Sequence, residues 1–169
     1  MSPPVRFPGL SAWLEWQQGL HPHAIEPGLE RLRRVLLRTG WSPPDVPVVT
    51  VGGTNGKGSR VVFLEAILRA GDRRVGTFTS PHLVDYRERI RLDGVEASDA
   101  SLVAAFERIA DALHGDSLTF FEFNTLAALL VFETAAPDAI VLEVGMGGRL
   151  DAVNLVEPEV SVLVSIGLD

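Results

Sequence analysis

The sequence contains no cysteine, and Lys57 is the only lysine among its 15 cationic residues. Without cysteine, disulfides, cysteine-ligated zinc sites and thiol catalysis are excluded. No apolar run approaches the length of about 18 residues that a membrane-spanning helix needs. Met1 is not followed by the apolar core of a signal peptide. We therefore expect a cytoplasmic protein that does not cross a membrane.

The charge of the chain is unbalanced. The formal net charge is -7 at pH 7, and no tract of basic residues occurs, so we expect no binding to nucleic acid. Arginine supplies every cation except Lys57. A guanidinium is a planar fork, whereas an ammonium is a compact point charge on a flexible stem. The one position that keeps lysine therefore indicates a need for that point charge.

From residue 48 onward, short apolar runs alternate with amphipathic stretches. The apolar runs predict strands over residues 48–51, 75–79, 139–144 and 160–166. This alternation predicts an α/β fold, a P-loop-type, mainly parallel sheet with helices on both faces. We expect residues 1–47 to form a helical lead-in and residues 48–169 to form the P-loop ATPase domain.

Local signals mark several helix starts and one turn. The residues expected at helix starts are Ser11, Pro27, Ser98, and Thr119 with Glu122 as a capping box. The dipeptide Asp93-Gly94 predicts a hairpin turn between residues 90 and 95. Ligands of parallel sheets bind outside the carboxyl ends of the strands, so residues at those ends are candidates for function.

A glycine-rich stretch follows the first predicted strand. It reads Gly52-Gly53-Thr54-Asn55-Gly56-Lys57-Gly58-Ser59. Glycines let backbone N–H groups converge on a phosphate, and the N-terminus of the next helix favours an anion. We expect Lys57 to reach the terminal phosphates of ATP and the Ser59 hydroxyl to ligate Mg²⁺. The general P-loop pattern is not met to the letter, because Val51 replaces its first glycine and Gly58 separates Lys57 from Ser59.

Glu143 ends an apolar strand. A lone carboxylate at that position is well placed to hold Mg²⁺ beside a phosphate loop, and we expect it to act in catalysis with Lys57. The alternative is a charge that simply emerges at the end of a strand.

Several motifs, in order along the chain, resemble the folate branch of the Mur-ligase superfamily, dihydrofolate synthase/folylpolyglutamate synthase. They are the nucleotide loop Gly53-Thr54-Asn55-Gly56-Lys57-Gly58-Ser59, then Thr79-Ser80-Pro81-His82-Leu83 with Glu88-Arg89-Ile90, then Phe120-Phe121-Glu122-Phe123 with Thr125, and the block from Glu143 to Ala152 with Asn154. The segment Pro27-Gly28-Leu29-Glu30-Arg31 is similar to the leading helix of the family. The resemblance covers nearly the whole chain.

The resemblance implies an ATP- and Mg²⁺-dependent ligase of folate biosynthesis. Such an enzyme phosphorylates the carboxylate of dihydropteroate or of a folate, and the amino group of L-glutamate then attacks the acyl phosphate. The resemblance implies that Ser80 and Glu143 are Mg²⁺ ligands. It also implies a histidine ligand just after a Leu-Asp pair, which here is Leu168-Asp169.

The resemblance places further residues at the substrate and extends beyond this chain. The substrate residues that it implies are His82, Phe121, Glu122, Arg149 and Asp151. Members of the family act on small molecules and are expected to be monomers. They are much longer than this chain, so we expect an N-terminal part that is incomplete for catalysis.

Simpler interpretations of the substrate residues stay open. The capping box explains Glu122, packing or surface exposure explains His82, and mutual pairing explains Arg149 and Asp151. A further pattern is the alternation of arginines at positions 87, 89 and 91. On a strand these would share one face, either lining a pocket for an acidic substrate or lying in solvent.

Three other interpretations of the whole chain are kept. It resembles, less closely, a peptidoglycan Mur ligase, although those enzymes carry a sizeable domain before the loop. It also fits a module that binds nucleotide without ligation, or a remnant that binds none.

Overall fold

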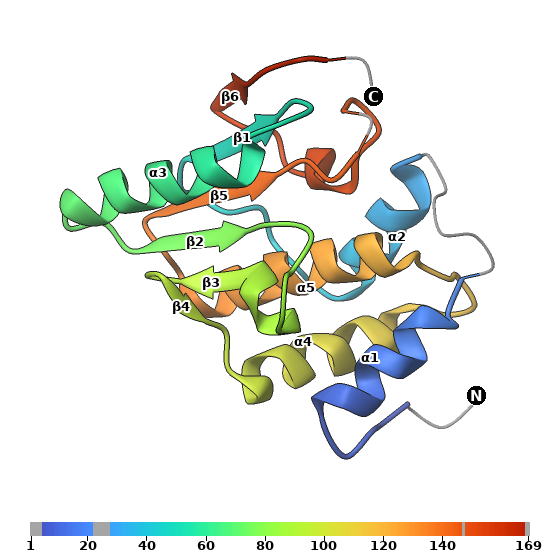
Figure 1. Cartoon of the computed structure of the whole chain (residues 1–169). Helices are drawn as coiled ribbons and strands as arrows, with labels where there is room; N and C mark the ends of the chain where they lie inside the picture. Colours follow the sequence, from blue (N-terminus) through green and yellow to red (C-terminus); the bar gives the residue numbers. More distant parts are fainter. Residues whose placement is uncertain (1–4, 22–27, 147, 168–169) are drawn as a thin grey trace.

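The computed structural model describes residues 5–21, 28–146 and 148–167. They form one six-stranded sheet in the order β4-β3-β2-β5-β1-β6, with helices on both faces (Figure 1). The strands are β1 (Val48–Gly52), β2 (Val75–Phe78), β3 (Ile90–Leu92), β4 (Val95–Glu96), β5 (Ala139–Glu143) and β6 (Val160–Leu163). The helices are α1 (Leu10–Gln18), α2 (Glu30–Arg38), α3 (Lys57–Ala70), α4 (Asp99–Ala112) and α5 (Phe120–Ala135), with 3-10 helices η1 (Tyr86–Arg89) and η2 (Ala152–Leu155).

The four strands predicted from apolar runs lie side by side and run parallel, which confirms the α/β fold. β1 is flanked by β5 and β6, and β5 also pairs with β2. The predicted hairpin is β3 and β4, and β3 extends the sheet by pairing antiparallel with β2. Asp93 and Gly94 both have positive φ, 55° and 78°, as a two-residue turn of type I′ requires.

The two faces of the sheet bury separate apolar clusters. Along β5, Ile140 and Leu142 face the larger cluster, whereas Val141 faces the smaller one, because successive side chains of a strand point to opposite faces. The smaller cluster lies under α3, and the larger one includes residues of α1, α2, α4 and α5 (Figure 1). No helix in the described part of the chain is long and apolar enough to cross a membrane.

Two of the predicted helix starts are confirmed. The Ser98 hydroxyl accepts a hydrogen bond from the Ser101 N–H, and Thr119 and Glu122 form the capping box at the start of α5. The prediction for Ser11 is wrong. The helix α1 begins one residue earlier, with Gly9 as its N-cap and no side-chain cap, so Ser11 already lies inside the first turn. Pro27 lies outside the described residues, and α2 begins at Glu30.

The arginines at positions 87, 89 and 91 do not share the face of a strand. Asp85 and Glu88 form a capping box, which folds Tyr86–Arg89 into η1, and only Arg91 lies on β3. The three side chains consequently separate. Arg87 pairs with Asp85 and Arg91 pairs with Glu65 of α3, while Arg89 is buried.

Candidate functional site

The glycine-rich loop joins the end of β1 to the start of α3. Gly56 is the N-cap of α3 in the left-handed conformation, with φ 84°. Gly53 also has positive φ, and a Cβ atom there would lie 2.5 Å from Cγ2 of Val164. No other residue fits that position without displacing its neighbours. The first-turn N–H groups of α3 thus lie at the end of the sheet where a phosphate would bind.

Lys57 is folded back over this loop. Its ammonium donates to the carbonyl oxygens of Gly53, at 2.8 Å, and of Thr54, at 3.3 Å. The residue is half-buried. A charge held by two neutral carbonyls keeps much of its capacity to bind an anion, because within the described residues no carboxylate forms an ion pair with it.

The segment after β6 supports the loop from the other side. The Thr54 N–H donates to the Ser165 carbonyl at 2.8 Å, and the Ser165 hydroxyl donates to the Asn55 carbonyl at 3.0 Å. The Gly167 N–H donates to the Thr54 hydroxyl at 3.1 Å. Residues 164–167 therefore fix the path of the loop.

Glu143 ends β5 next to β1, where its carboxylate meets the first turn of α3. Oε2 accepts a hydrogen bond from the Ser80 N–H at 3.1 Å and would lie 3.7 Å from a Cβ atom at Gly58. Glu143 is 4% exposed, and this burial raises the pKa of its carboxyl, with the Ser80 N–H and the Lys57 charge acting in the opposite direction.

The donor set near the loop suits Mg²⁺ better than a metal that needs a cage of side chains. The Glu143 carboxylate accepts a hydrogen bond from the Ser80 N–H, and Ser59 lies in the first turn of α3, which Glu143 faces. Mg²⁺ commonly binds one or two carboxylates, keeps several waters and takes the rest of its ligands from phosphates. Within residues 5–21, 28–146 and 148–167, no three His, Cys, Asp or Glu side chains are grouped to hold a metal.

A cavity of about 830 Å³ opens beside the loop. The residues that line it come from the loop, the start of α2, the stretch between β2 and β3, the start of α5 and the segment between β5 and η2. They include Lys57, Ser80, Arg89, Phe120, Phe121, Glu122, Met146, Arg149 and Asp151. The cavity therefore extends from Lys57 of the phosphate loop to a part lined by the rings of Phe120 and Phe121, which we call the aromatic chamber.

Phe121 forms part of the aromatic wall. Its ring packs against the backbone of Gly145, where an added Cβ would lie 2.6 Å from Cζ, and its centroid is 5.7 Å from that of Phe78. Gly145 thus allows the loop after β5 to approach the ring.

Glu122 lies at the edge of the cavity but is strongly engaged. Its carboxylate accepts from the Thr119 N–H at 2.7 Å and from Nη2 of Arg31 at 2.8 and 3.0 Å. Glu122 is 5% exposed. It therefore anchors α2 to the first turn of α5, in addition to capping that helix.

Asp151 organises the segment between β5 and η2. Its two carboxylate oxygens accept from the N–H groups of Met146, at 2.9 Å, and Val153, at 3.1 Å. Burial raises the pKa of the Asp151 carboxyl, while these N–H groups oppose the shift. The alternative that Arg149 pairs with Asp151 is not met, because Arg149 is exposed and no such ion pair is present among the described residues.

His82 does not line the cavity. Its Nδ1 accepts a hydrogen bond from Nε of Arg89 at 2.7 Å, and its ring lies edge-on to Tyr86. Arg89 is the residue that reaches the cavity. Two signals in the sequence involved it, its place among the alternating arginines and its place in the motif Glu88-Arg89-Ile90, but neither distinguished it from its neighbours as a site residue. Leu168-Asp169, predicted to precede a metal-binding histidine, lie outside the described residues.

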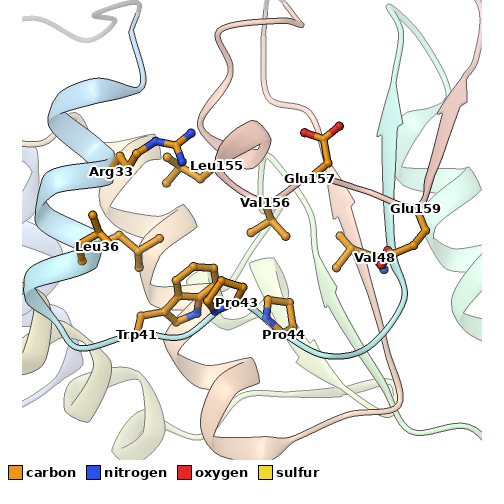
Figure 2. Close-up of a pocket in the computed structure, with 11 residues that line it drawn as sticks. Arg33, Leu36, Trp41, Pro43, Pro44, Val48, Leu155, Val156, Glu157 and Glu159 are labelled. Atoms are coloured by element: carbon orange, nitrogen blue, oxygen red, sulfur yellow. The ribbon is translucent and has the colours of Figure 1, made fainter.

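A second cavity, of about 340 Å³, lies between α2, the linker before β1 and residues 155–159 (Figure 2). Its walls are mainly apolar, with Leu36, Trp41, Pro43 and Val156 among them. Glu159 reaches past this cavity to accept a hydrogen bond from the Val48 N–H. The polar groups expected of a catalytic centre therefore gather at the larger cavity and not here.

Comparison with known proteins gives the same partial match throughout. No family model matches the sequence. The chain is 47% identical over 160 residues to dihydrofolate synthase/folylpolyglutamate synthase of Escherichia coli, covering 95% of this chain but only 38% of that protein. A solved structure of E. coli FolC with DHPP and ADP superposes with a TM-score of 0.92 at 46% identity, over 95% of this chain and 39% of the other.

A second solved structure matches over the full chain. It is the bifunctional folylpolyglutamate synthase/dihydrofolate synthase of Yersinia pestis with AMPPNP and a Mn ion, with a TM-score of 0.91 and 45% identity. This chain covers 41% of the length of that protein. The chain thus spans about two fifths of the proteins that it matches.

Proposed function

We infer, from the premise that this chain is homologous to part of dihydrofolate synthase/folylpolyglutamate synthase, that it contributes the ATP-phosphate and acid-binding half of such a ligase. The reaction would join L-glutamate to dihydropteroate or to a folate. The relatives with ADP, or with AMPPNP and Mn, support ATP and a divalent cation, for which we propose Mg²⁺. Residues 48–169 would form the ATPase domain.

One observation carries this proposal. The same cavity is lined by Lys57 of the phosphate loop and by Phe121 and Glu122 of the aromatic chamber. A ligase of this type must bring a carboxylate to the terminal phosphate of ATP, so the nucleotide and acid sites must be continuous. One cavity that reaches from Lys57 to Phe121 and Glu122 supports this arrangement.

Each residue of the site would have a separate role. Lys57 would leave the carbonyls of Gly53 and Thr54 and neutralise the phosphoryl group that is transferred. Ser59, Ser80 and Glu143 would hold Mg²⁺, which supplies charge neutralisation for the phosphates when bound. Phe120 and Phe121 would pack against the flat rings of the acid, and Asp151 would accept hydrogen bonds from its ring N–H groups.

The nucleotide half of the proposal is tested by calorimetry. We expect the chain to bind ATP in a Mg²⁺-dependent manner and Lys57→Ala to weaken binding about 10- to 100-fold, because a charge-assisted contact is lost. Arg73→Ala is a matched control, since it removes an exposed cation from the turn after α3, at the end far from the loop. Equal Kd values for Lys57→Ala and the unmutated chain would contradict the proposal.

The ligase half needs a second measurement. ADP release that depends on both L-glutamate and dihydropteroate supports ligation. Nucleotide binding without such release, in a protein that carries the full length of the relatives, would instead support a binding module.

A further inference from the structure

Arg89 is the only buried arginine within residues 5–21, 28–146 and 148–167, at 8% exposure. No carboxylate forms an ion pair with it in that part of the chain. The next two arginines in burial are both neutralised, Arg31 by Glu122 and Arg91 by Glu65. A buried cation without a counter-charge is costly, so its presence indicates a function.

The contacts of Arg89 fix its orientation. Nε donates to Nδ1 of His82 at 2.7 Å, and the guanidinium carbon lies 5.5 Å from the centroid of the Phe120 ring. The terminal nitrogens Nη1 and Nη2 make no hydrogen bond to any residue that the structure describes. Since Arg89 lines the 830 Å³ cavity, these two nitrogens are the groups that it offers to a ligand.

The chemistry of that ligand follows from the fork and from its surroundings. A guanidinium with two free terminal nitrogens matches a carboxylate, which it binds through two parallel hydrogen bonds. The rings of Phe120 and Phe121 flank the same cavity and favour an aromatic group attached to that carboxylate. A triphosphate already has its donors at the glycine-rich loop, where Lys57 and the first turn of α3 supply them.

We propose that Arg89 binds the carboxylate of the acid substrate and thereby selects an acid over an uncharged analogue. This inference rests on the proposed function, because it takes the acid from that reaction. Arg89 is thus a specificity-determining residue that aligns the carboxylate before it reaches the phosphate of ATP. Burial also lowers the pKa of Arg89, which an anion in the cavity would offset.

The test compares two probes that differ at one group, a carboxylate in one and its uncharged amide in the other. Binding of 7,8-dihydropteroate and of its primary carboxamide is measured by calorimetry on the unmutated chain, Arg89→Met and Arg89→Lys. We expect the unmutated chain to prefer the acid by about 10- to 100-fold, the value of a charge-assisted contact. Arg89→Met should lose that preference while keeping its affinity for the carboxamide, and Arg89→Lys should retain part of it.

Arg87→Met is the matched control. Arg87 lies on the same 3-10 helix but pairs with Asp85 and does not line the cavity, so the preference for the acid should be unchanged. Circular dichroism and urea unfolding establish that each variant is folded.

Three results would overturn the inference. Equal weakening of both probes by Arg89→Met would assign Arg89 a structural role. Weakening of ATP binding with no change in the preference for the acid would make it a phosphate contact. If neither probe binds while ATP does, the pterin-acid part of the proposed function fails as well, which separates that failure from the first two.

Discussion

The contact between Arg31 and Glu122 predicts that replacing Arg31 lowers the free energy of unfolding by a large amount. Arg31 lies on α2 and Glu122 in the first turn of α5, with 14% and 7% of their side chains exposed. Replacing Arg31 with methionine leaves the Glu122 carboxylate buried with one N–H donor, that of Thr119. Removing one partner of a buried pair costs about 3–5 kcal/mol. For a protein of this size that corresponds to a fall in Tm of about 6–20 °C.

A double-mutant cycle isolates the pair from the other contacts of Arg31, which include the Ser117 carbonyl and His21. The chains are Arg31→Met, Glu122→Gln and the combination, each unfolded in urea. Glutamine keeps an acceptor for the capping box, so Glu122→Gln removes the charge and one acceptor oxygen while the cap is retained. We expect the combined loss to be smaller than the sum of the single losses by about 2 kcal/mol.

Arg34→Met is the control, because Arg34 lies on the same helix, is 54% exposed and pairs with Asp116 at the surface. Its cost should stay below about 1 kcal/mol. A coupling between Arg31 and Glu122 below about 0.5 kcal/mol would refute the reasoning. Glu122 would then contribute little to stability through Arg31 and would be free to contact the substrate.

Two further predictions concern the site itself. Burial raises the pKa of the Glu143 carboxyl above its unfolded value, so its ionisation destabilises the folded state as pH rises. Glu143→Gln should therefore raise Tm at pH 8 and raise it by less at pH 5. The same substitution should abolish the Mg²⁺ dependence of ATP binding. An unchanged Tm at pH 8 would mean that burial does not oppose the charge. Gly145→Ala should cost about 1–3 kcal/mol and weaken dihydropteroate binding, because its Cβ would meet the Phe121 ring at 2.6 Å. Urea unfolding together with calorimetry checks this, and full stability in the variant would show that the ring moves away freely.

The sequence predicted those parts of the fold that depend on local patterns. The apolar runs of β1, β2 and β5 are legible because each of these strands lies between two neighbours and is largely buried. β6 was also predicted from its apolar run, although it is the edge strand beside β1 and is mostly exposed. Ser98 and Thr119 were predicted as caps because the donor lies within three residues. The prediction at Ser11 failed because Gly9 is already the N-cap of α1, which begins at Leu10.

The sequence predicted which residues belong to the candidate site better than it predicted how they are arranged. Lys57, Ser80, Phe121, Glu122, Arg149 and Asp151 meet at one cavity, while their roles stay predictions. Glu143 lies beside the loop, held by the Ser80 N–H.

The arrangement of Arg89 could not be anticipated. Its side-chain direction depends on η1, which a capping box at Asp85 creates, and an alternating pattern of arginines points instead to a strand. The pair of Arg31 with Glu122 spans 91 positions of the chain, and no local pattern reports such a contact.

Residues 164–167 support the glycine-rich loop but are synthesised long after it, which affects when the loop can take its final structure during synthesis. The Ser165 hydroxyl reaches Asn55 across 110 positions and the Gly167 N–H reaches Thr54 across 113. A ribosome that adds about 5–20 residues per second delivers these partners roughly 5–20 s after the loop itself. Throughout that interval the nascent chain carries the loop without the groups that shape it. On the proposed function, ATP would therefore stabilise the chain fully only after Ser165 and Gly167 have made these contacts.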